Sequence, residues 1–108
     1  MKVAIAVTPD GMVGGGWGKA RDVALATVEN GAIQDWQVEH VEWDRLHDEG
    51  GEGQHHARIA RFLLDHQVNQ VITGHMGPGM EHMLGRMGIQ IVTGVSGPAK
   101  DVVLQHAR

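Results

Sequence analysis

Metal-binding side chains and glycines alternate in the stretch 74–80, Gly-His-Met-Gly-Pro-Gly-Met. His75 and Met76 offer an imidazole nitrogen and a thioether sulfur, which suit soft or borderline metal ions. Apolar residues 71–73 predict a strand before this stretch, and the spacing of residues 80–87 predicts a helix after it. Glycines in such a turn let a ligand approach the backbone, and the N–H groups of the first helical turn favour an anion. The stretch therefore predicts an anion site with metal ligands beside it.

The histidines are unevenly distributed, because six of the eight lie between His47 and His82. His55 and His56 open a predicted helix, where neighbouring side chains diverge, so we expect at most one of them to face a shared site. The predicted helices contain no His-x-x-x-His or Glu-x-x-His pair of the kind found in zinc enzymes. Any single histidine is also explained by a solvated surface position. His75 is the foremost candidate for a functional role, followed by His55 or His56.

The methionines divide into two groups. Met80, Met83 and Met87 recur at helical spacing with Leu84, which favours core packing over a thioether copper site. Met76 lies in a loop and is therefore a better candidate ligand.

A glycine-rich loop at residues 14–21, Gly-Gly-Gly-Trp-Gly-Lys-Ala-Arg, is a second candidate anion cradle. It matches neither the P-loop nor the dinucleotide fingerprint, and a glycine run is equally typical of a flexible tip. Lys19 and Arg21 favour an anionic ligand. Trp17 is expected to mark a contact surface, since a large aromatic side chain in such a loop has little to pack against.

Catalytic groups are scarce, and we predict that the chain is not an enzyme. The absence of cysteine excludes disulfides, thiol catalysis and cysteine-held iron–sulfur clusters. Ser96 is the sole serine, and with Pro98 it predicts the N-cap and first turn of a helix rather than a nucleophile. The first strand has no carboxylate of the kind that a two-metal nuclease requires.

Length and charge narrow the class of protein further. A chain of 108 residues suits one domain, which we assign to residues 1–108. The formal net charge of −4 argues against nucleic-acid binding. Residues 1–7 are too few for a signal sequence, and no apolar run approaches membrane-spanning length, so we expect a cytoplasmic protein without a membrane partner.

The elements needed to position these residues form an α/β fold. The patterns predict strands at residues 2–8, 23–29, 32–43, 68–73 and 89–93, and helices at residues 54–67, 79–87 and 97–106, the last capped by Ser96. The resulting order β-β-β-α-β-α-β-α predicts a five-stranded mixed sheet flanked by helices. Asn30-Gly31 predicts a hairpin, and the third strand is expected near a sheet edge with a bulge. Loops 9–19, 74–79 and 94–97 should then meet at the carboxyl ends of the parallel strands, with the loop 44–53 folding over them.

Several segments together resemble the dinitrogenase iron–molybdenum cofactor-binding family, which includes nitrogenase cofactor carriers and the Orange protein. They are residues 1–7, Trp17-Gly18-Lys19-Ala20, residues 51–56, Val71 to Gly79, Gly88-Ile89 and residues 94–97. Family members often have His-Phe-Gly-Arg-Ala at residues 16–20 and glycine at position 75, where this chain differs. The resemblance implies a ribonuclease H-like fold and a non-catalytic carrier or scaffold for a metal–sulfur cluster of the Fe–Mo or Mo–Cu type.

A thiometallate cluster is an anion that brings its own sulfide, so the protein must supply N–H donors, positive charge and one or two neutral ligands. The predicted metal ligands are His75, Met76, His55 and His56. The predicted cofactor-binding residues are Gly16, Trp17, Gly18, Lys19, Gly74, His75, Met76, Gly77, Gly79, Ser96 and Gly97.

Partners would be a cluster donor and a cluster acceptor protein, with the chain itself a monomer or weak dimer. The alternative is a cofactor-free regulatory or interaction module of the same fold, in which Trp17, Trp36 and Trp43 form a partner surface. A phosphate-bearing metabolite at the same helix start is a third possibility.

Overall fold

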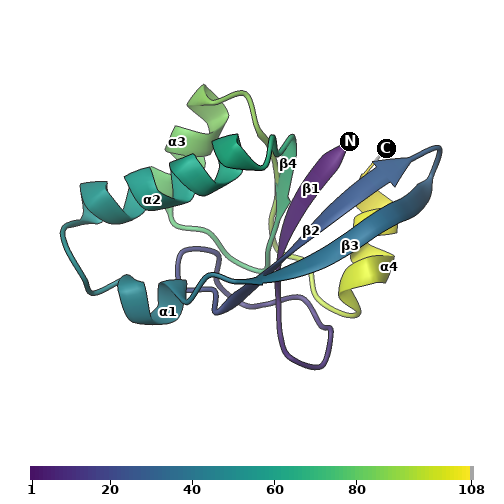
Figure 1. Ribbon diagram of the computed structural model, residues 1–108, viewed down its shortest axis with the longest axis horizontal. Helices are drawn as coiled ribbons and strands as arrows, with labels where there is room; N and C mark the ends of the chain where they lie inside the picture. Colours follow the sequence, from purple (N-terminus) through teal and green to yellow (C-terminus); the bar gives the residue numbers. More distant parts are fainter. Residues whose placement is uncertain (108) are drawn as a thin grey trace.

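The computed structural model describes residues 1–107 and contains a five-stranded mixed sheet in the order β3-β2-β1-β4-β5 (Figure 1). β2 is antiparallel to both of its neighbours, whereas β1, β4 and β5 run parallel to one another. The predicted α/β fold, a five-stranded mixed sheet flanked by helices, is confirmed. The strands are β1 (Lys2–Val7), β2 (Asp22–Glu29), β3 (Ala32–His40), β4 (Gln70–Ile72) and β5 (Gln90–Val92).

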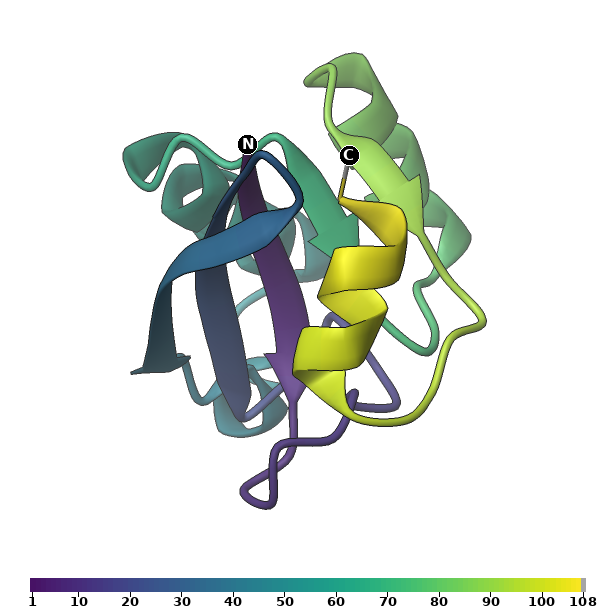
Figure 2. The same cartoon turned by 90° about the vertical axis from the view of Figure 1, so that its right-hand side faces the viewer.

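Helices cover both faces of the sheet. Residues of α2 and α3 form one buried cluster with one face of β1 and β2, and α4 forms a second cluster with the other face. Figure 2 shows α4 in front of the sheet with α2 and α3 behind it. None of the helices within residues 1–107 combines the length and apolar character needed to cross a membrane. The helices are α1 (Trp43–Leu46), α2 (Glu52–Asp65), α3 (Pro78–Arg86) and α4 (Ala99–His106).

The sequence of β1 explains its central place. Ala4 and Ala6 pack toward α2 and α3, whereas Val3 and Ile5 pack toward α4. Successive side chains of a strand point to opposite faces, so a strand covered on both faces is apolar at almost every position. The apolar run therefore fixes β1 between two helical layers.

The third strand is shorter than predicted. β3 ends at His40, and Trp43 begins the one-turn helix α1 instead of continuing the strand. Glu42 takes a left-handed conformation with φ of 53°, which breaks the extended chain, and its N–H donates to the carbonyl oxygen of Arg21. The predicted edge position is confirmed, and so is the bulge, since the β2–β3 register shifts between Thr27 and Val28.

The predicted N-cap at Ser96 is wrong. α4 begins at Ala99, its N-cap position is Pro98, and Ser96 is exposed. The Ala99 N–H donates to the carbonyl oxygen of Gly11 at 2.9 Å. A backbone group from the loop after β1 therefore satisfies the helix start that a serine side chain was expected to cap.

Candidate functional site

The loops after β1, β4 and β5 meet through backbone hydrogen bonds, as predicted. The Gly74 N–H donates to the carbonyl oxygen of Gly14 at 3.1 Å, and the Gly94 N–H donates to that of Gly74 at 2.9 Å. The Trp17 N–H donates to the carbonyl oxygen of His75 at 2.9 Å. These bonds place the glycine loop (residues 14–18) directly beside the His75 turn.

Backbone from the glycine loop packs so closely against Gly74 that any side chain there would crowd it. A Cβ atom at position 74 would lie 3.0 Å from the carbonyl oxygen of Gly15 and 3.1 Å from that of Gly14. Backbone atoms cannot move aside as a flexible side chain can. This close approach is what holds the two loops together at the base of the site.

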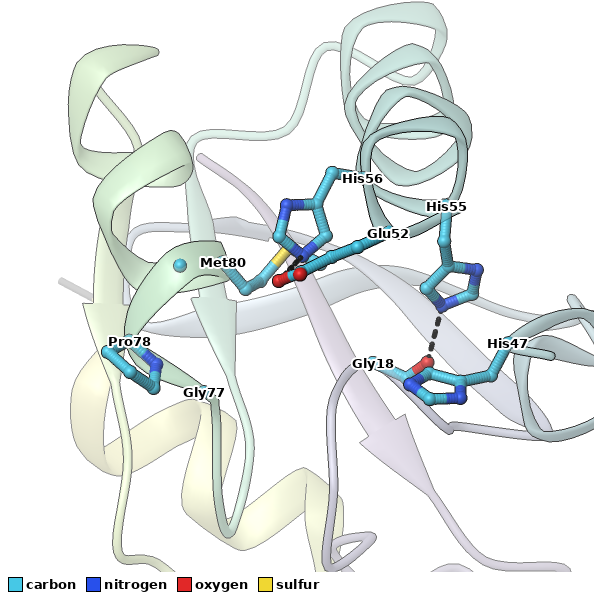
Figure 3. A pocket seen from close by; sticks show the side chains of 9 residues that line it. Gly18, His47, Glu52, His55, His56, Gly77, Pro78 and Met80 are labelled. Atoms are coloured by element: carbon cyan, nitrogen blue, oxygen red, sulfur yellow. Dashed lines mark hydrogen bonds and ion pairs between the residues drawn. The ribbon is translucent and has the colours of Figure 1, made fainter. Parts of the chain in front are cut away.

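Two adjoining cavities open above these loops. The larger has a volume of about 410 Å³ and lies between the first turns of α2 and α3 (Figure 3). The smaller has a volume of about 330 Å³ and lies between the glycine loop and the His75 turn. Both are lined by Gly18, His47 and Gly77. His47 comes from the loop after α1, so the prediction that this loop folds over the site is confirmed.

The lining of each cavity combines glycines with histidine and methionine. The larger cavity is also lined by Glu52, His55, His56, Pro78, Gly79 and Met80. The smaller cavity is also lined by Gly16, Trp17, Lys19, His75 and Met76.

The first turns of α2 and α3 make the larger cavity favourable for an anion. Their N-cap residues are Gly51 and Gly77, and neither helix start in the described chain has a side-chain cap. The first N–H groups of a helix have no partner within the helix, and the helix dipole gives that end a partial positive charge. Two such ends therefore meet at one cavity.

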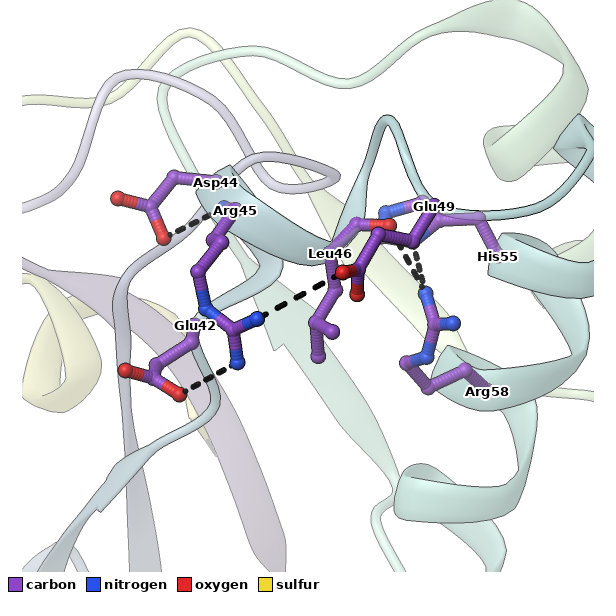
Figure 4. A network of polar contacts seen from close by, with 7 residues as sticks. All are labelled: Glu42, Asp44, Arg45, Leu46, Glu49, His55 and Arg58. Carbon is purple, nitrogen blue, oxygen red and sulfur yellow. Dashed lines mark hydrogen bonds and ion pairs between the residues drawn. The ribbon is translucent and has the colours of Figure 1, made fainter.

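His55 is buried and engaged through both ring nitrogens. Its Nε2 lies 2.7 Å from the carbonyl oxygen of Gly18, and its Nδ1 lies 2.8 Å from Nη1 of Arg58 (Figure 4 shows the Arg58 side). A carbonyl only accepts and a guanidinium only donates, so Nε2 carries the hydrogen and Nδ1 accepts. Metal ligation by His55, which the sequence suggested, would require one of these bonds to break.

His56 is only half-buried and faces the same cavity as His55. Its Nε2 lies 3.7 Å from Oε1 of Glu52, one turn earlier on α2. The expectation that at most one of the paired histidines faces a shared site is therefore wrong. The two rings diverge, but His55 reaches Gly18 on one side of the cavity while His56 reaches Gly79 on the other.

Glu52 was missed because α2 begins two residues before the predicted start at residue 54. A glutamate in the first turn of a helix is a recognised start signal, since it complements the helix dipole. Pro78 similarly precedes the predicted start of α3, although proline favours the first turn. Met80 was assigned to the core, and it is indeed buried, but it also lines the larger cavity.

Only some of the remaining predicted site residues line one of the two cavities. His75 is exposed and Met76 is buried, and both line the smaller cavity. Gly74, Ser96 and Gly97 line neither cavity, although Gly74 packs against the glycine loop. No group of three or more His, Cys, Asp or Glu side chains suited to a metal ion occurs among residues 1–107.

Trp17 is not an exposed contact residue, so that expectation is wrong. Its side chain is fully buried and lies edge-on against Trp43. The indole Nε1 of Trp17 is buried without a hydrogen-bond partner in the described part of the chain. Lys19, two residues later, is exposed and supplies a positive charge beside the smaller cavity.

Comparisons with known proteins agree with this architecture. Residues 1–108 match the model of a family described as dinitrogenase iron-molybdenum cofactor. No curated protein shows significant sequence similarity to the chain. The crystal structure of PH0822 is 25% identical with a TM-score of 0.76, over 95% of this chain and 86% of that one.

Two further structures are similar in fold. The protein mj0327 of Methanocaldococcus jannaschii, named as a candidate dinitrogenase, is 14% identical with a TM-score of 0.68, over 96% of this chain and 84% of that one. TM1290 of Thermotoga, named as a candidate NifB protein of the DUF35 family, is 17% identical with a TM-score of 0.69. The match covers 94% of this chain and 83% of that one. On the full-length family match, this chain belongs to the dinitrogenase iron–molybdenum cofactor family.

Proposed function

We propose that this protein is a non-catalytic, cytoplasmic carrier or scaffold for an anionic metal–sulfur cluster of the Fe–Mo or Mo–Cu type, held in the two adjoining cavities. The observation that carries this proposal is the convergence of two helix starts with glycine N-caps on a cavity of about 410 Å³ lined by histidine and methionine. Helix N-termini favour anions, and the family match favours a molybdenum-containing cargo.

The donor set suits a cargo that arrives with most of its own ligands. A sulfide cluster needs hydrogen bonds to its sulfur atoms and a small number of neutral ligands from the protein. His56 in the larger cavity and His75 with Met76 in the smaller one are the candidate ligands. Imidazole and thioether groups also suit copper(I). Trp17 lines the smaller cavity, and its indole N–H is a buried donor without a partner among residues 1–107.

The charges around the cavities are mixed. Lys19 and the helix starts favour an anion, whereas the carboxylate of Glu52 opposes it. The Glu52 side chain is 82% exposed, so solvent screens much of its charge. The balance therefore favours an anion that contacts backbone N–H groups, with Glu52 weakening its binding.

The direct test is reconstitution with a defined cluster. The protein is incubated anaerobically with tetrathiomolybdate and copper(I), passed through a sizing column, and analysed for metal and visible absorption. We expect sulfide-to-metal charge-transfer bands to elute with the protein. A colourless, metal-free protein peak would overturn the proposal.

Variants in the two cavities locate the cargo. We expect His75→Ala and Met76→Ala to lower metal retention if the smaller cavity supplies ligands, and His56→Ala to lower it if the larger one does. His82→Ala is the matched control, because His82 is exposed on α3 and lines neither cavity. If all four variants retained as much metal as the wild-type protein, neither cavity would supply these ligands.

The interaction-module alternative has less support than the sequence suggested. Trp17 and Trp43 are buried in the core, and Trp36 is half-buried with the ammonium of Lys100 5.4 Å from its ring centre. A carrier instead requires a cluster donor and a cluster acceptor as partners. We propose that the carrier is a monomer or weak dimer, which sedimentation velocity over a range of concentrations tests.

A further inference from the structure

We propose that His55 and Arg58 form a positioning pair that sets the separation between the glycine loop and the loop carrying His47. With His55 held in this way, His56 is the histidine of α2 that meets the cargo. The second part of this inference rests on the proposed function, whereas the first part does not.

The pair joins three segments that are far apart in the sequence. His55, on α2, donates from Nε2 to the carbonyl oxygen of Gly18 at 2.7 Å. Arg58, one turn later, donates from Nη1 to Nδ1 of His55 at 2.8 Å and to the carbonyl oxygen of Leu46 at 3.3 Å. The glycine loop, α2 and the end of α1 are therefore linked through one imidazole and one guanidinium (Figures 3 and 4).

These links hold two residues, Gly18 and His47, that line both cavities. Gly18 accepts the hydrogen bond of His55, and His47 follows Leu46 directly in the chain. The His47 ring also lies edge-on against the His55 ring, with centroids 5.1 Å apart. Because both cavities are lined by Gly18 and His47, this linkage holds in place one side that the two cavities share, facing Gly77 at the start of α3.

Arg58 differs from the next arginine on the same helix. Arg61 pairs with Asp65 at 3.2 Å, and its side chain is 79% exposed, as is typical of a solvated helix surface. Arg58 instead directs its guanidinium to a buried imidazole and a backbone carbonyl. A guanidinium presents several N–H donors in fixed directions, which suits it to hold two acceptors at once.

Among residues 1–107, no hydrogen bond engages either ring nitrogen of His56. Its contact with Glu52, at 3.7 Å, is longer than a hydrogen bond. His55, by contrast, would have to give up a bond to Gly18 or to Arg58 before either nitrogen could bind a ligand. The two neighbouring histidines therefore have different roles, one positioning the walls and the other facing the cargo.

The positioning pair is tested without any cargo. Long-range ¹H–¹⁵N correlation spectra should show His55 with the hydrogen on Nε2 and an unprotonated Nδ1.

We expect Arg58→Gln to raise hydrogen-exchange rates about tenfold at the amides of Ala20 and His47, which border the linked loops, because a buried hydrogen bond contributes of the order of that factor. Arg58→Lys should restore part of the protection, and Arg61→Gln should change nothing. The opposite tautomer, or unchanged exchange in Arg58→Gln, would overturn the pair.

The affinity for tetrathiomolybdate distinguishes the positioning role of His55 from the ligand role of His56. Glutamine offers one donor and one acceptor group in place of the neutral imidazole, so His55→Gln should keep the affinity within about threefold, whereas His55→Leu and His56→Gln should lose about tenfold or more. His82→Gln is the control. A loss of affinity in His55→Gln equal to that in His55→Leu would contradict a role of His55 that rests only on its two hydrogen bonds. If the wild-type protein binds no tetrathiomolybdate, the proposed function and the role of His56 both fail, while the exchange measurements still decide the positioning pair.

Discussion

Trp17 lies edge-on against Trp43, with ring centroids 5.1 Å apart and planes inclined by 72°. Trp43 in turn packs edge-on against Phe62 at 5.3 Å. The three rings come from the glycine loop, α1 and α2, which are the same segments that the His55–Arg58 pair links. Edge-to-face aromatic pairs are each worth about 0.5–1.5 kcal/mol beyond their burial. This aromatic cluster therefore packs together the three segments that also carry the His55–Arg58 linkage.

This packing predicts unequal roles for the tryptophans. Trp43→Ala should lower the free energy of unfolding by about 3–5 kcal/mol, as expected for removal of a buried aromatic side chain. Trp36→Ala should have a much smaller effect because Trp36 is half-buried on the edge strand β3. Urea unfolding followed by circular dichroism measures both. Equal losses would contradict the assignment of Trp43 to the core.

Gly74→Ala should destabilise the protein. The new methyl group would meet two backbone carbonyls of the glycine loop at 3.0–3.1 Å, and overpacking of this kind costs about 1–3 kcal/mol. Gly85→Ala is the matched control, since Gly85 is exposed within α3 and should gain up to about 1 kcal/mol of helix propensity. Thermal unfolding should therefore shift in opposite directions for the two variants. A shift in the same direction would show that the loops separate easily at Gly74.

Asp22 depends on His40 across the β2–β3 pairing. The two residues are register partners, Asp22 is buried, and His40 Nδ1 lies 2.5 Å from Oδ1 of Asp22. His40→Ala would leave the buried carboxylate without this partner, which should cost about 1–3 kcal/mol in urea unfolding at neutral pH. The double variant Asp22→Asn/His40→Ala should recover part of this loss, and His106→Ala should be neutral. Additive losses in the double variant would show that the pair is not coupled.

The charges beside the cavities should act in opposite directions on an anionic cargo. Glu52→Gln should strengthen tetrathiomolybdate binding and Lys19→Gln should weaken it, each by about two- to fivefold at low salt, as is typical of exposed charges. Both effects should shrink in about 1 M salt, where screening is strong. Glu81→Gln, in the first turn of α3 but outside both cavities, is the control. Changes of equal sign for Glu52 and Lys19 would argue against an anion in these cavities.

The sheet was predictable because its signals are local. Asn30-Gly31 predicted the hairpin between β2 and β3, and both residues take the positive φ values, 54° and 75°, that such a turn requires. The apolar run of β1 predicted a strand covered on both faces, which the two core clusters confirm. Backbone preference and alternation of side chains act over a few residues, so the sequence expresses them directly.

The errors arose where distant segments decide the outcome. Trp17 is buried partly because Trp43 of α1 packs edge-on against it, and Trp43 in turn packs on Phe62 of α2. α4 begins at Ala99 without a serine cap because the carbonyl oxygen of Gly11 accepts its first N–H. Neither partner is recognisable from the residues next to it in the chain.

The sequence by itself determined the five strands, three of the four helices, the family and the chemistry available at the carboxyl ends of the strands, since glycine turns, histidine and methionine are properties of short segments. Only the tertiary structure decided which of these side chains hold the loops in place and which face the cavities. His55 and His56 are neighbours of the same type, yet one is bonded to the carbonyl oxygen of Gly18 and to Arg58 while the other stays available. A hydrogen bond between residues separated by 37 positions exists only once the sheet has brought their loops together.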